Sequence, residues 1–188
     1  GRPFAVNVPL LYPAVEEHMK SIVELNVPVV ITSAGNPKAW TAYLKEHGVR
    51  VMHVVSSVKF GLKAEQAGVD AVIAEGFEAG GHNGREETTT MCLVPAVADA
   101  CEGPVIAASD WISELPQIIS DFVPNRYVVL GTDGYGRSDT REALRRHFEV
   151  DTASIVITAL STLYREGKIK AKVVNEAMRT FEWSKDKP

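Results

Sequence analysis

Six short apolar runs recur along the chain with helical patterns between them, and this alternation constrains the fold more than any other feature. The runs occupy residues 4–8, 29–32, 51–55, 71–75, 105–108 and 127–131. Most are continuously apolar rather than alternating, which is typical of strands covered on both faces. Because a strand, a helix and a further strand make a parallel βα unit, the order predicts an α/β fold with about six mostly parallel strands.

The segments between the runs carry the signals that begin and end helices. Asn36 precedes Pro37, which gives an N-cap followed by proline at the first helical position. Gly48 and Gly68 fit the position just after a helix ends, and Asp151 can cap an apolar helix. These signals predict a helix in each of the early crossovers.

The rhythm changes late in the chain, because two or three helical patterns follow residue 138 and no strand succeeds them. Six strands are too few for a closed eight-stranded barrel, and right-handed crossovers in one direction place their helices on one face. We expect the late helices to cover the other face, which turns a partial barrel into a three-layer α/β/α sandwich. A homodimer that buries this face is the alternative.

Composition excludes several classes of partner. The 188 residues carry a net charge of −4 and no long basic run, so neither nucleic acid nor a membrane is expected. The sequence starts almost in a strand, without an initiator Met or a signal peptide, which favours a fragment or a processed chain. Cys92 and Cys101 fall on opposite faces of a predicted helix, so we expect two unlinked thiols in a reducing compartment and no metal site.

The loop AEGFEAGGHNG, residues 74–84, is the first candidate site. It follows a predicted strand and therefore lies at the carboxyl edge of the sheet, where parallel α/β proteins bind ligands. Gly80 and Gly81 would let a ligand approach the backbone, and Glu75 could accept a hydrogen bond from a ring or ribityl group. His82 places an imidazole suited to proton transfer beside them. A glycine-rich turn with a solvated histidine is the alternative interpretation.

Longer runs around this loop point to a family: PFAVNVPLLYP, VVITSAGNPK and HVVSSVKFGLKAEQAGVDAVIAEGFEAGGHNGREETTT. They resemble the FMN-dependent nitronate monooxygenases and the related flavin-dependent enoyl-acyl-carrier-protein reductases, over about residues 3–104. The resemblance implies a (β/α)8 barrel fragment with FMN at its carboxyl face and His82 as catalytic base or substrate-side residue. The residues implied to lie at the flavin are Asn7, Glu75, Gly76, Gly80 and Gly81.

The resemblance also implies that the flavin site is incomplete. It begins at the second barrel strand, so the first strand and its flavin-contacting loop are not matched. The family continues the strand at residues 105–108 with a glycine pair that helps to hold the FMN phosphate, whereas here Ser109 and Asp110 follow. A carboxylate beside a phosphate dianion is repulsive.

From about residue 103 to 182 the sequence changes character, with the run GPVIAASDWISELPQIISDFVPNRYVVLGTDGYGRSDTREALRRHFEVDTASIVITAL. It resembles the C-terminal domain of the homodimeric pyruvate dehydrogenase E1 component, a transketolase-C-terminal-like α/β fold whose thiamine-binding domains are not matched. Arg137, Arg141 and Arg145 could form an anion site. The alternative is a solvated face in which Glu142 and Glu149 offset the arginines.

Two families thus meet within residues 105–108 without a linker, whereas natural fusions join complete domains through exposed linkers. We interpret the chain as an engineered chimeric scaffold, with fragments 1–104 and 105–188 packed as one domain, in the cytoplasm as both families imply. We expect no complete catalytic site, no turnover and no resident cofactor. The alternatives are an FMN-dependent oxidoreductase and a weak module that binds FMN or a phosphate-like anion.

Overall fold

The computed structural model describes residues 4–81 and 83–183. The chain divides into two compact units, Gly1–Cys101 (unit 1) and Glu102–Pro188 (unit 2), with a boundary next to the expected one at residues 104 and 105. The α/β class with mostly parallel strands is confirmed, and each of the six strands lies within a residue or two of its predicted range. The packing of the fragments as one domain stays a prediction.

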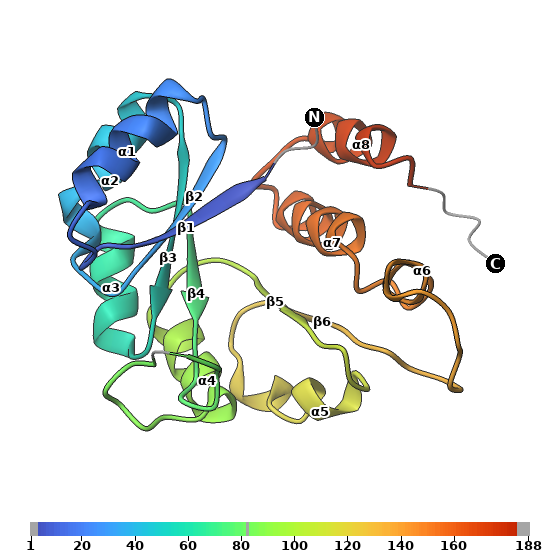
Figure 1. Ribbon diagram of the computed structural model, residues 1–188. Coiled ribbons are helices and arrows are strands. Elements are labelled where there is room, and N and C mark those ends of the chain that lie inside the picture. Colours follow the sequence, from blue (N-terminus) through green and yellow to red (C-terminus); the bar gives the residue numbers. More distant parts are fainter. Residues whose placement is uncertain (1–3, 82, 184–188) are drawn as a thin grey trace. The chain divides into compact units, whose positions relative to one another are not determined.

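Unit 1 is a four-stranded parallel sheet whose strands follow one another in the order β1-β2-β3-β4. The strands are β1 (Ala5–Pro9), β2 (Val29–Ser33), β3 (Arg50–Val55) and β4 (Ala71–Ala74). The helices are α1 (Val15–Glu24), η1 (Pro37–Ala39), α2 (Thr41–Glu46), α3 (Val58–Gln66) and α4 (Thr90–Ala100). Figure 1 shows α1, α2 and α3 along the same side of this sheet, as crossovers of one hand require. Consecutive order with one-sided helices is the arrangement of a partial (β/α) barrel.

The core of unit 1 lies between the sheet and these helices. It is a cluster of buried aliphatic side chains: Val8, Met19, Ile22, Val27, Val30, Leu44, Val49 and Val51. The alternate strand positions, such as Ile31 and Met52, are only half-buried. Because successive side chains of a strand point to opposite faces, one face of the sheet carries the core, and the other corresponds to the face that lines the interior of a closed barrel.

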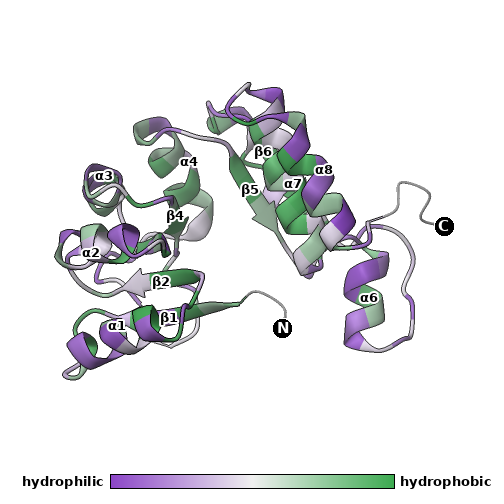
Figure 2. Cartoon of the chain, turned by 90° about the horizontal axis from the view of Figure 1, so that it is seen from above, coloured by the Kyte–Doolittle hydropathy of each residue, from purple (hydrophilic) through white to green (hydrophobic). Residues whose placement is uncertain are grey.

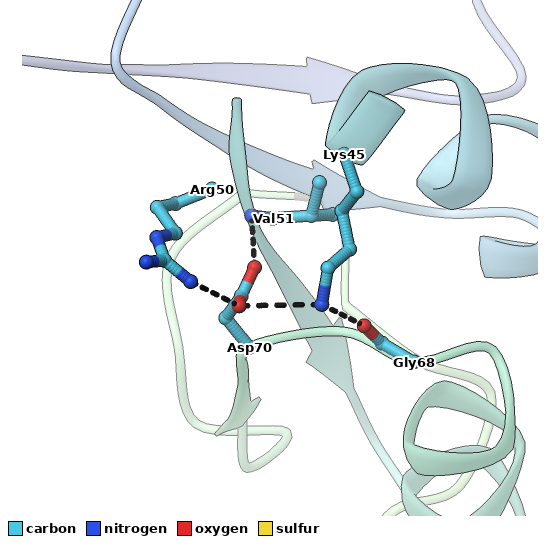
Figure 3. A network of polar contacts seen from close by, with 5 residues as sticks. All are labelled: Lys45, Arg50, Val51, Gly68 and Asp70. Carbon is cyan, nitrogen blue, oxygen red and sulfur yellow. Dashed lines mark hydrogen bonds and ion pairs between the residues drawn. The ribbon is translucent and has the colours of Figure 1, made fainter. Parts of the chain in front are cut away.

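A polar network ties the amino end of β4 to β3, as Figure 3 shows. The Asp70 carboxylate accepts hydrogen bonds from the Val51 amide at 2.9 Å, Arg50 Nη1 at 3.1 Å and Lys45 Nζ at 3.3 Å. Lys45 also donates to the Gly68 carbonyl at 2.7 Å. Burial raises the pKa of Asp70, but these hydrogen bonds outweigh it and hold the pKa below its ordinary value.

Unit 2 contains a two-stranded parallel sheet of β5 (Val105–Ala108) and β6 (Tyr127–Leu130). Its helices are α5 (Glu114–Gln117), η2 (Ser120–Phe122), α6 (Arg141–His147), α7 (Thr152–Arg165) and α8 (Ala171–Thr180). In Figure 1, α5 and α7 lie on opposite sides of the two strands, and α7 packs against β5 and α8. Figure 2 shows that α7 is largely hydrophobic, which explains why it packs against other elements, whereas α6 is mostly hydrophilic.

The expected three-layer sandwich requires one sheet, and here the structure differs, because the strands form two sheets. β5 pairs along its length with β6, from Val105 opposite Tyr127 to Ala108 opposite Leu130. Strand β5 thus meets its partner within unit 2, and helices lie on both sides of this small sheet. The late helices thus cover the small sheet of unit 2, and the sheet of unit 1 carries its own crossover helices α1, α2 and α3 along one side.

The predicted helix signals are confirmed. The Asn36 side chain accepts from the Lys38 amide at 3.2 Å, ahead of Pro37. The Asp151 carboxylate accepts from the Ser154 amide at 2.9 Å at the start of α7.

Candidate flavin site at the carboxyl edge of unit 1

The carboxyl ends of β1 to β4 meet at one edge of the sheet because the strands are parallel and consecutive. The Leu10 amide continues the pairing of β1 with β2 by donating to the Ser33 carbonyl at 2.7 Å. The Glu75 amide continues the pairing of β4 with β3 by donating to the Val55 carbonyl at 2.9 Å. This edge is where a parallel sheet binds its ligand.

Asn7 is the middle residue of β1 and lies on the face of the sheet opposite the crossover helices of unit 1. Its neighbour Val8 is buried in the core, so the Asn7 side chain belongs to the opposite face, in register with Ile31. The Asn7 amide is exposed, and its Oδ1 accepts from Ser33 Oγ at 3.5 Å, a long hydrogen bond. The amide therefore keeps most of its donor and acceptor capacity for a ligand on this face.

The loop after β4 has a fixed base. Gly76 is buried, and a Cβ there would overlap Thr90 and Glu78. The Phe77 amide donates to the Thr88 carbonyl at 3.0 Å, and the Thr90 amide donates to Glu78 Oε1 at 2.8 Å. Backbone hydrogen bonds, first from its own amide and then from Thr90, lower the pKa of Glu78. The base of the loop therefore requires glycine at position 76 because the start of α4 packs against it.

The tip of the loop, in contrast, is open. A Cβ at Gly80 or Gly81 would meet nothing within 4 Å, and Gly81 has φ +89°, a conformation that favours glycine. Asn83 Nδ2 braces the loop by donating to the Phe77 carbonyl at 2.5 Å and the Ala79 carbonyl at 2.8 Å. The backbone at residues 80 and 81 can therefore be approached closely by a planar ligand.

The implied site residues thus lie on two elements. Glu75 is half-buried directly after β4, next to Gly76, and Asn7 lies on β1, at the far side of the sheet from β4. His82, the implied catalytic residue, lies outside the described residues. The assignment of these residues to a flavin stays a prediction.

Sequence reasoning missed the residues that hold the loop. Ser56, just after β3, donates to Glu86 Oε2 at 2.9 Å, and Gly84 packs against Ser56. Together with Glu78 and Asn83, this pair fixes the path of the loop. No local signal could have found them, because the partners are separated by up to 30 positions and meet only once the loop is folded.

The position where the family carries a phosphate-binding glycine pair has a different role here. Asp110 Oδ2 accepts from Arg145 Nη2 at 3.2 Å within unit 2, and the Trp111 amide donates to Ser109 Oγ at 3.1 Å. The side chains of residues 109 and 110 thus take part in hydrogen bonds within unit 2.

Three further features bear on the kind of site that the described residues could form: a metal cluster, a membrane-spanning helix and a disulfide. In residues 4–81 and 83–183 there is no group of three or more His, Cys, Asp or Glu side chains that could hold a metal ion. Within the same ranges no helix is long and apolar enough to cross a membrane. Among the described residues no disulfide joins Cys92, which is exposed, to Cys101, whose pKa is raised by burial and by the charge of Glu65.

Consecutive parallel strands with one-sided helices and an open carboxyl edge define unit 1 as a partial (β/α) barrel. The nitronate monooxygenase family model matches residues 4–113, more than half of the chain. The chain belongs to the nitronate monooxygenase family.

Two solved structures agree with this assignment. FabK from Thermotoga maritima is 40% identical, with a TM-score of 0.57 over 70% of this chain and 42% of FabK. Nitroalkane oxidase from Streptomyces ansochromogenes is 26% identical, with a TM-score of 0.53 over 70% of this chain and 50% of that one. The chain thus spans half or less of these relatives.

Part of the chain is also similar to a second kind of protein, which confirms the predicted double resemblance. The pyruvate dehydrogenase E1 component of Mycolicibacterium smegmatis is 47% identical over 96 residues, which is 51% of this chain and 10% of that protein. That of Escherichia coli K12 is 43% identical over 96 residues, 50% of this chain and 11% of that protein. The matched length and that of the family model together exceed 188 residues, so the two similarities overlap.

Proposed function

We propose that the chain is a chimeric α/β scaffold whose unit 1 keeps the ring-side half of a flavin site, binds FMN weakly and carries out no turnover. One observation supports it most directly. Exposed Asn7 lies on β1, and the open backbone of Gly80 and Gly81 lies in the loop at the carboxyl end of β4 of the same sheet. An amide and accessible peptide groups are the kind of donors and acceptors that a flavin ring binds.

We expect no turnover because the contacts that would hold the FMN phosphate are incomplete. Asp110 stands in place of a glycine and is paired with Arg145. The sheet of unit 1 has four strands rather than the eight of a full barrel, and the chain covers 42% of FabK. A site that keeps only the ring-side residues lacks the phosphate contacts, and it does not exclude water as flavin chemistry requires.

Flavin fluorescence in a titration with the protein tests the proposal. We expect saturable binding of FMN with a Kd on the order of 100 μM. Asn7→Ala should weaken it several-fold, whereas the matched control Asn175→Ala, at an exposed position on α8, should leave it unchanged. If both variants lost the same affinity for FMN, or if neither lost any, the proposed ring-side site would be wrong.

The second candidate is an FMN-dependent oxidoreductase, which membership of the family favours. It predicts sub-micromolar FMN binding and turnover of a nitronate that His82→Ala abolishes. Observing both would replace the scaffold proposal with an enzyme.

A further inference from the structure

A pocket of about 540 Å³ opens in unit 2 where β5 and β6 end. This size falls in the range of small-molecule sites, and the carboxyl ends of parallel strands are where such sites occur. The lining combines charged, apolar and glycine residues, drawn from the loops after both strands and from α6. All of its lining residues belong to unit 2.

Hydrogen bonds join the two strand-end loops that contribute to the lining of the pocket. Ser113 donates to the Asp133 carboxylate from its amide at 2.8 Å and from its hydroxyl at 2.6 Å. The Thr132 amide donates to the Trp111 carbonyl at 2.8 Å. These bonds fasten the loop after β6, which supplies Thr132 to the lining, to the loop after β5, which supplies Asp110.

Three arginines line the pocket, and they differ in what they already bind. Arg145 is paired with Asp110 at 3.2 Å. Arg137 lies 4.0 Å from Asp139 and 3.3 Å from His147 Nδ1. Among the described residues no side-chain hydrogen bond or ion pair involves Arg141, the first residue of α6. The lining therefore holds more guanidinium groups than carboxylates, and one guanidinium remains available for a ligand.

The rest of the lining is apolar. Leu144 and Phe148 are half-buried and Val150 is 7% exposed, so they form a nonpolar floor beside the arginines. If the arginines formed only a solvated face whose positive charge is offset by Glu142 and Glu149, we would not expect buried apolar side chains beside them. Neither glutamate lines the pocket.

We propose that this pocket binds a small organic oxyanion, a carboxylate or phosphate group carried on an aromatic or aliphatic body. The planar guanidinium of Arg141 matches two oxygens of such a group, and the body packs on Leu144 and Phe148. Asp110 weakens the site, because it occupies Arg145 and adds a negative charge to the lining.

Calorimetric titration of the intact chain with phenyl phosphate, benzoate, inorganic phosphate and benzamide tests this. We expect phenyl phosphate or benzoate to bind, inorganic phosphate to bind at least about tenfold more weakly, and neutral benzamide not to bind. Binding by benzoate alone or by phenyl phosphate alone identifies which oxyanion is preferred.

Three variants distinguish a specific binding site from nonspecific attraction of anions. Arg141→Gln should lower the affinity at least about tenfold, while Arg179→Gln, at an exposed position on α8, should leave it unchanged. Asp110→Asn should raise the affinity about threefold by releasing Arg145. The proposal would be overturned if the two arginine variants lost affinity equally or if Asp110→Asn gained none. It would also be overturned if benzamide or inorganic phosphate bound as tightly as the aromatic anions, or if neither aromatic anion bound at millimolar concentration.

Discussion

Replacing Asp70 with alanine should destabilise unit 1 by about 2–3 kcal/mol. The main loss is the hydrogen bond from the Val51 amide to a charged acceptor, which contributes about 1.5–3 kcal/mol. The ion pairs with Lys45 and Arg50 add less than about 1 kcal/mol together, since those side chains are 40% and 73% exposed. Asp70→Asn keeps an acceptor for the Val51 amide and should cost only about 1 kcal/mol.

Urea unfolding followed by tryptophan fluorescence measures this loss. Trp40 lies in unit 1, and replacing Trp111 and Trp183 with phenylalanine isolates its signal. The matched control is Asp99→Ala on α4, at an exposed position, which should change the free energy of unfolding by less than about 0.5 kcal/mol. A loss below about 0.5 kcal/mol for Asp70→Ala would refute the reasoning that this network joins β3 to β4.

The pH dependence supplies a second check. Because the pKa of Asp70 is lower in the folded chain than the roughly 3.9 of an unfolded one, its contribution is complete above that value. The contribution is lost as the pH falls through the folded pKa. Asp70→Asn should therefore unfold with a shallower acid dependence than the wild type.

Three further predictions concern the core, the loop and a helix cap. Burial lowers the pKa of His53, so unit 1 should lose stability as the pH falls below about 6.5, and His53→Gln should remove that slope in urea titrations. Gly76→Ala should destabilise unit 1 by about 1–3 kcal/mol through overlap with Thr90, whereas Gly80→Ala should cost much less; thermal unfolding compares them, and equal losses would contradict the loop geometry. Asp151→Ala should cost unit 2 about 1 kcal/mol in urea unfolding by removing the N-cap of α7.

The strands could be predicted because their signal is local. Continuous apolar runs between helix signals located all six, and the one-sided helices of unit 1 follow from the hand of the crossovers. The pairing of strands could not be predicted in the same way. The runs AVIA and VIAA that form β4 and β5 look alike, yet β4 pairs with β3 and β5 pairs with β6. Pairing depends on tertiary contacts that a single run of residues does not encode.

The candidate site likewise has features that could be predicted from the sequence and features that could not. Its location at the carboxyl edge follows from chain order, so the loop after β4 could be selected from the sequence. The bonds of Glu78 to Thr90 and of Ser56 to Glu86 could not, because they depend on the conformation of that loop. The ion pair between Asp110 and Arg145 spans 35 positions and gave no local signal.

Comparison of FMN with riboflavin, which lacks the phosphate, tests the central claim of a half-site most directly. If only the ring side is retained, the two flavins should bind with similar, weak affinities in a fluorescence titration. A functioning phosphate grip with two or more charge-assisted hydrogen bonds would favour FMN by about 100-fold or more. Similar Kd values support the account, whereas a strong preference for FMN, or no binding of either flavin at millimolar concentration, would contradict it.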